Sequence, residues 1–175
     1  MTSEGRIESI RTRLLNLSRS RGESFDFVLV RYGVERFLYR LSRSDQGDRF
    51  ILKGATLFQV WNRELHRPTR DLDLLGFGSD DAESMRRSML AVLRVKCPED
   101  GLAFDQESLL VEPSRDAMEY GGLRGGQASD VGGVPEQERA GATGLWSSRG
   151  TNPRGHGVDL DQVNSSFDLS LAKPA

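Results

Sequence analysis

The sequence has very few of the residues that build disulfide-linked or metal-stabilised folds. Its 175 residues include one cysteine, Cys97, and two histidines, His66 and His156. This composition excludes a disulfide framework and a cysteine-based metal cage, and it argues against a zinc site made of several histidines. We therefore expect Cys97 to be a small core residue.

Long apolar runs and a strong net charge are also lacking. No stretch approaches the roughly 20 apolar residues that a membrane helix needs, and the N-terminus lacks the basic-then-apolar plan of a signal peptide. The formal net charge of -2 indicates neither a strongly basic nucleic-acid binder nor an acidic tail. For a chain of this length, a soluble cytoplasmic protein with one sizeable core is the expectation.

The first 50 residues predict two helices. In the first, apolar residues recur at a spacing of three or four: Ile7, Ile10, Leu14 and Leu17. Arg21-Gly22 should end this helix, and Ser24 is a suitable N-cap for the second. The buried stripe of the second helix would be Val30, Val34, Phe37, Leu38 and Leu41. The arginines on the other face of the first helix leave two interpretations open, an RNA-facing surface or, as we favour, a solvated face.

Short apolar runs predict three strands after the second helix. They cover residues 50–52, 71–74 and 109–111. In the second of these strands, Leu72 and Leu74 alternate with Asp71 and Asp73. A period of two is typical of a strand with one buried face.

Helices are predicted between these strands. A short helix should follow Gly54, and a longer helix should begin at a capping box formed by Asp80 and Glu83. Met85 and Met89 would then be core residues at helical spacing. Helices that alternate with strands predict a mixed α/β domain.

Two acids and a glycine turn form the candidate site. Because Asp71 and Asp73 are two residues apart on a strand, their carboxylates should project from the same face. Carboxylate oxygens suit the octahedral shell of Mg²⁺, and the same pair could bridge a second metal ion. Gly54 would let the backbone approach a triphosphate, and Thr56 would offer a hydroxyl and an N–H to phosphate. An Asp-x-Asp pair alone is also common at strand ends as solvated or capping residues, so the interpretation depends on the longer pattern.

Two basic residues flank these positions. Lys53 could contact phosphate, but a lysine at the end of a strand is more often a solvated charge. Arg70 would either neutralise phosphate or pair with Asp71. We expect His66, in a polar loop, to be solvated.

This pattern resembles the opening motif of the AbiEii/AbiGii-type nucleotidyltransferase toxins. Residues 53–75 contain its glycine, small hydroxyl residue, arginine–threonine step and Asp-x-Asp-Leu. The similarity extends over the preceding helices and through Tyr120-Gly121-Gly122-Leu123-Arg124. By position, Asp71 and Asp73 match the family's metal-binding pair, and Gly54 with Thr56 matches its phosphate-cradling turn.

The resemblance implies a fold and an activity. The fold is the polymerase-β-like nucleotidyltransferase fold, here incomplete and preceded by two helices. The activity is the Mg²⁺-dependent transfer of a nucleotidyl group from NTP to an acceptor such as tRNA. The resemblance also implies a toxin that is restrained by a cognate antitoxin.

The pattern of the family stops after Arg124. The resemblance implies a third carboxylate on a later strand and a helical C-terminal half with a functional lysine, and neither is found in residues 125–175. Eleven of the nineteen glycines lie between Gly121 and Gly157. This composition predicts a largely disordered tail. Because the family's pattern stops after Arg124, a second hypothesis is that the tail is translated out of frame after a slip near Gly125.

We therefore expect three stretches and leave three hypotheses open. The stretches are an N-terminal helix, a partial nucleotidyltransferase domain and a Gly-rich tail, over residues 1–21, 22–124 and 125–175. The chain would be a nucleotidyltransferase impaired by the missing acid, a non-catalytic module that binds NTP or an antitoxin, or a remnant without function.

Overall fold

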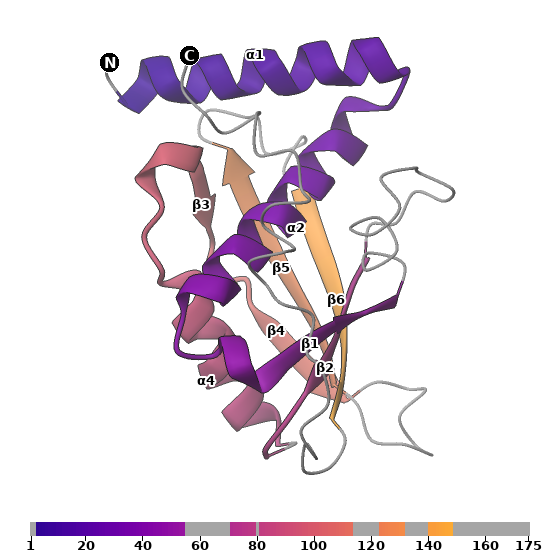
Figure 1. Cartoon of the computed structure of the whole chain (residues 1–175), viewed down its shortest axis with the longest axis vertical. Helices are drawn as coiled ribbons and strands as arrows, with labels where there is room; N and C mark the ends of the chain where they lie inside the picture. The colour runs from indigo at the N-terminus through magenta and orange to yellow at the C-terminus, as the bar shows by residue number, and fades with distance from the viewer. Residues whose placement is uncertain (1–2, 55–70, 80, 114–122, 132–139, 149–175) are drawn as a thin grey trace.

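The structure is a computed structural model, and two long helices open it (Figure 1). It describes residues 3–54, 71–79, 81–113, 123–131 and 140–148. Helix α1 (Ser3–Arg21) is followed by Gly22, whose φ of 65° is typical of the left-handed residue that ends a helix. Helix α2 (Phe25–Arg43) begins at Ser24, whose hydroxyl accepts a hydrogen bond from the Phe27 N–H at 3.2 Å. The boundaries predicted for both helices around residues 21–24 are confirmed.

Helix α2 is buried on nearly all sides, because α1, the sheet and a third helix all pack against it. Its predicted apolar stripe is buried in full. On another side, Val28 and Leu29 pack against Ile10 and Leu14 of α1. The polar residues Glu35, Arg36 and Arg40 are also buried. A single-stripe pattern did not predict this extent of burial.

Six strands form one sheet beside these helices. They are β1 (Phe50–Lys53), β2 (Asp71–Gly76), β3 (Leu102–Phe104), β4 (Leu110–Pro113), β5 (Leu123–Val131) and β6 (Ala140–Ser148). The order is β1-β2-β6-β5-β3, and β4 also pairs with β5. The β2–β6 pair is parallel, and the other described pairs are antiparallel. The mixed α/β class is therefore confirmed.

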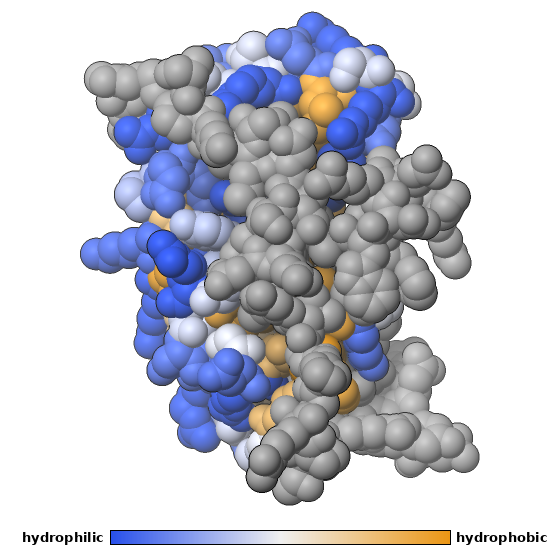
Figure 2. All heavy atoms as spheres, viewed as in Figure 1, coloured by the Kyte–Doolittle hydropathy of each residue, from blue (hydrophilic) through white to orange (hydrophobic). Residues whose placement is uncertain are grey.

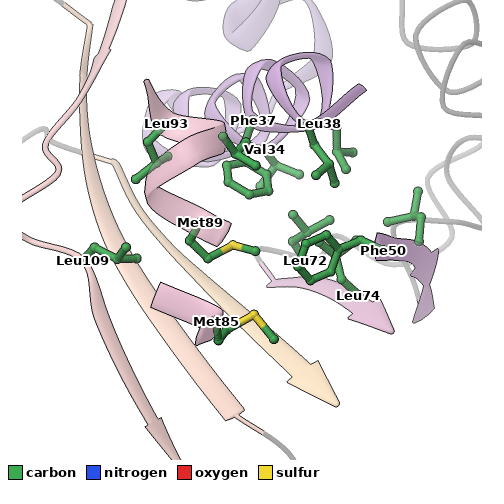
Figure 3. Close-up of a cluster of buried hydrophobic side chains, with 13 residues drawn as sticks. Val34, Phe37, Leu38, Phe50, Leu72, Leu74, Met85, Met89, Leu93 and Leu109 are labelled. Carbon is green, nitrogen blue, oxygen red and sulfur yellow. The ribbon is translucent and has the colours of Figure 1, made fainter. Parts of the chain in front are cut away.

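The main core lies between the sheet and helices α2 and α4 (Ala82–Leu93). Figure 3 shows apolar side chains from both helices meeting those of β1 and β2. Leu72 and Leu74 of β2 are 5% and 0% exposed within this core. The face of β2 that carries Leu72 and Leu74 is thus the face covered by helices.

The described residues expose few large apolar side chains. Figure 2 shows that hydrophilic residues make up most of the described part of one face, with apolar residues in small patches. Among the described residues, Leu110 is the one exposed large apolar side chain, at 70%. A single exposed leucine is ordinary on a protein surface.

The N-cap of α4 is Asp81, so the predicted capping box of Asp80 and Glu83 is wrong by one residue. Asp81 Oδ1 accepts a hydrogen bond from the Ser84 N–H at 2.7 Å, and Oδ2 accepts one from the Ser79 hydroxyl. The Ser79 hydrogen bond and then the Ser84 hydrogen bond lower the pKa of Asp81. Adjacent aspartates are equally good caps in sequence, and the packing of the apolar face of α4 selects between them.

Strands β5 and β6 differ from the expectation that the Gly-rich tail is disordered. They place residues 123–131 and 140–148 in the middle of the sheet, and residues 149–175 lie outside the described ranges. The strand prediction missed them because they contain few apolar residues. Strand pairing uses backbone N–H and C=O groups, which glycine, alanine and serine also provide.

A buried ion pair that the sequence analysis did not single out joins α2 to the turn before β3. Arg40 Nη1 lies 2.7 Å from Asp100 Oδ2, and Nη2 lies 3.2 Å from Oδ1. The side chains are 3% and 0% exposed. A bidentate pair of this kind is strong only when its remaining polar atoms are also satisfied.

The surrounding backbone and a tyrosine satisfy these atoms. Arg40 donates further hydrogen bonds to the carbonyls of Val95 and Leu102, each at 3.2 Å. Asp100 Oδ1 accepts the Leu102 N–H at 3.0 Å, and the Asp100 carbonyl accepts the Tyr32 hydroxyl at 2.8 Å. The pair therefore connects α2, the loop after α4 and β3.

We expect Asp100→Ala to lower the free energy of unfolding by about 3–5 kcal/mol, because it leaves the Arg40 charge buried without a partner. The double variant Arg40→Met/Asp100→Ala should lose less than this, since it removes both charges. Urea denaturation of the three variants, including Arg40→Met alone, measures the coupling in a double-mutant cycle. If the double variant is as unstable as the sum of the singles, the two residues are not coupled.

Alkaline pH should destabilise the protein partly through Tyr32. Burial, and then the Asp100 charge, raise the pKa of Tyr32 above its ordinary value. Above about pH 10 the unfolded chain loses this proton while the folded chain keeps it, so stability falls by up to about 1.4 kcal/mol per pH unit. Tyr32→Phe should lose about 1 kcal/mol at neutral pH from the missing hydrogen bond, and it should show a shallower alkaline decline. Parallel stability curves for the two proteins between pH 8 and 11 would contradict this.

Candidate functional site

The pairing of β1 with β2 brings Gly54 against Asp73. Lys53, the last residue of β1, lies opposite Asp73 in the antiparallel register, and Gly54 follows with a φ of 72°. A Cβ atom at Gly54 would lie 2.0 Å from Asp73 Oδ2. Only a glycine backbone can therefore approach this carboxylate so closely, both for steric reasons and because of the left-handed φ.

Asp73 lies on the face of β2 that the helices leave uncovered. Leu72 and Leu74 are buried under α2 and α4, and strand alternation puts Asp73 on the opposite face. Asp73 is half-buried. The backbone of Asp71 is part of β2, while its side chain lies outside what the structure describes.

Of the other predicted site residues, the structure describes only Lys53. Lys53 is exposed at the end of β1. Thr56, Arg70 and His66 fall in residues 55–70, outside the described ranges, as does the short helix predicted after Gly54. Their contribution to the site stays a prediction.

Strand β6 is the neighbour of β2 on the side away from β1. Its parallel register puts Thr143 opposite Asp71 and Leu145 opposite Asp73. The sequence of β6, AGATGLWSS, contains no aspartate, glutamate or histidine. The strand beside the two acids therefore supplies no further carboxylate.

The geometry fits a divalent cation that arrives with a phosphate ligand. Mg²⁺ is commonly held by one or two carboxylates together with substrate phosphates and water. The close approach of Gly54 to Asp73 leaves exposed backbone beside one such carboxylate. Among the described side chains, there is no group of three or more potential metal ligands. The Asp71 side chain is not among those described.

Arg49 holds the other end of the β1–β2 pair, and the sequence analysis did not identify it. It donates hydrogen bonds to the Phe77 carbonyl at 3.4 Å and to the Ser88 hydroxyl of α4 at 2.7 Å. The Arg49 carbonyl accepts the Phe77 N–H at 2.8 Å. An arginine directly before an apolar strand was the only sequence signal for this contact.

Cys97 and the first helix have structural roles. Cys97 is 7% exposed, as predicted for a core residue, and burial raises the pKa of its thiol. Arg6 of α1 donates a hydrogen bond to the Pro98 carbonyl at 3.0 Å. Within the described part of the chain, every helix is too short or too polar to cross a membrane.

Comparison with known proteins identifies the family. A search of curated proteins gives no match. A family model described as nucleotidyl transferase AbiEii toxin, type IV toxin–antitoxin system, matches residues 36–137, which is more than half of the chain. The matched region contains Gly54, Asp71 and Asp73. The chain therefore belongs to the AbiEii nucleotidyl transferase toxin family of type IV toxin–antitoxin systems.

Proposed function

We propose that this chain binds Mg-NTP at Asp71 and Asp73 and transfers a nucleotidyl group to an acceptor such as tRNA. The observation that carries the proposal is the contact of the Gly54 backbone with the Asp73 carboxylate. Family membership supports nucleotidyl transfer in general. A cognate antitoxin is the protein partner that this family membership suggests.

Each residue of the proposed site has a separate role. Asp71 and Asp73 hold the metal ion, which when bound neutralises phosphate charge. The turn at Gly54 admits a phosphate close to the backbone, and Thr56 offers it a hydroxyl and an N–H. Lys53 and Arg70 add positive charge near the triphosphate.

The proposed architecture is a polymerase-β-like nucleotidyltransferase domain that begins at residue 22 and, beyond the predicted end at residue 124, also includes β5 and β6, which lie in the middle of its sheet. Support comes from the different residues on the two faces of β2. Leu72 and Leu74 face the helices, and strand alternation predicts that the two acids face away from them. This arrangement leaves one side of the sheet to hold the protein together and the other to bind substrate.

We propose further that transfer is slow in this chain. Phosphoryl-type transfer depends on positioning and on charge neutralisation, so a missing metal ligand removes much of the rate. The absence of acids from β6 supports this and favours a second candidate function, a non-catalytic module that binds NTP or the antitoxin. Transfer of label from α-labelled NTP to RNA distinguishes an enzyme from a binding module.

Asp73→Asn tests the metal site. It should weaken Mg-NTP binding by at least about tenfold, because even residues that only orient metal ligands contribute this much. Binding is measured as the rise in the thermal midpoint with Mg-NTP, since a ligand of the folded state stabilises it. Glu107→Gln, which neutralises an exposed acid in the loop between β3 and β4, is the control and should bind normally. An unchanged response of Asp73→Asn to Mg-NTP would place the nucleotide elsewhere.

A pair of glycine variants tests the contact between the turn and Asp73. Gly54 and Gly22 both have positive φ, at 72° and 65°, but an added Cβ at Gly22 meets nothing within 4 Å. Gly22→Ala should therefore lose only about 1–2 kcal/mol of stability from backbone strain and bind Mg-NTP normally. Gly54→Ala carries similar strain and must also displace the Asp73 carboxylate, so its Mg-NTP binding should fall. Equal Mg-NTP binding by the two variants would show that the contact is not part of the site.

A further inference from the structure

Arg36 of α2 is a buried guanidinium with no counter-charge in the described part of the chain. The residue is 4% exposed, and its Nε is buried without a hydrogen-bond partner. Its side chain makes no ion pair with any described acid. Since an arginine remains protonated in proteins, this burial leaves a full positive charge uncompensated.

Two tyrosine rings hold this guanidinium. Its Cζ lies 5.8 Å from the centroid of the Tyr32 ring and 5.1 Å from that of Tyr39. Cation–π attraction offsets part of the desolvation of the charge. Contacts through the aromatic faces leave the in-plane N–H groups as the donors for an acceptor.

The two buried acids among the described residues are paired with other arginines. Asp100 is held by Arg40 at 2.7 Å, and Glu35 lies 3.5 Å from Arg31 on the same helix. A second positive charge contacts the Tyr39 ring. Cζ of the exposed Arg43 is 5.8 Å from the same Tyr39 ring. The surroundings of this ring are therefore positive.

We propose that Arg36 binds a phosphate group, and that Arg43, which contacts the same Tyr39 ring, adds positive charge to the site. Guanidinium groups form paired hydrogen bonds to phosphate, and two neighbouring cations favour a multiply charged oxyanion over chloride. This site is separate from the proposed metal site, because α2 covers the face of the sheet opposite to Asp73. One phosphate group cannot reach both, and the inference does not depend on nucleotidyl transfer.

The test compares phosphate with chloride at equal ionic strength on the full chain. Inorganic phosphate should raise the thermal midpoint of the unaltered protein above its value in chloride. Arg36→Gln should weaken phosphate binding by about tenfold or more, the loss expected for charged hydrogen bonds, and Arg43→Gln should weaken it less. Arg21→Gln removes the same charge from an exposed position at the end of α1 and should respond normally.

Stability without phosphate separates binding from a structural role. Arg36→Gln removes an uncompensated charge, so in chloride its midpoint should equal or exceed that of the unaltered protein. If this variant does not fold, Arg36→Lys keeps the charge but loses the planar pair of donors, and its phosphate response should also fall. Equal responses to phosphate and chloride in the unaltered protein, or a full response in whichever Arg36 variant folds, would overturn the proposal.

Titrations with ATP and with a single-stranded RNA oligonucleotide identify the source of the phosphate group. If Arg36→Gln weakens only RNA binding, the site takes a backbone phosphodiester. If it weakens only ATP binding, the site takes a nucleotide phosphate. Either result supports the proposed site. Both measurements compare the unaltered protein with Arg36→Gln, so they do not depend on Mg-NTP binding at Asp73.

Discussion

The ion pair between Arg40 and Asp100 is the interaction on which the position of α2 depends. It joins residues 60 apart in the sequence, and backbone carbonyls and an N–H satisfy its remaining polar atoms. Both apolar clusters include residues of α2, one against α1 and one against the sheet. Because the ion pair fixes α2 against β3, it influences the packing of both clusters.

The candidate site is a consequence of this packing. Because α2 and α4 bury Leu72 and Leu74, β2 presents Asp73 on the other face. The pairing of β1 with β2 then puts Gly54 beside Asp73. The chemistry proposed for one face of the sheet thus depends on apolar contacts made on the opposite face.

Local signals in the sequence were sufficient for much of the fold. The apolar spacing predicted both N-terminal helices, and the Ser24 cap marked the start of α2. The alternation of leucines and aspartates predicted β2. These predictions succeeded because helix caps and strand periodicity involve residues only a few positions apart. The motif around Gly54 also led to the family that the comparison confirmed.

By itself, then, the sequence determined the mixed α/β class, the two helices, the strand of the two acids and the family. Only the tertiary structure decided that Asp81 caps α4, that Arg40 pairs with Asp100, and that β5 and β6 fill the centre of the sheet. It also decided that Arg36 is buried and forms no ion pair with an acid of the described residues. The physical reason is the same in each case, since these features depend on contacts between residues far apart in the chain, which no local pattern of side chains encodes.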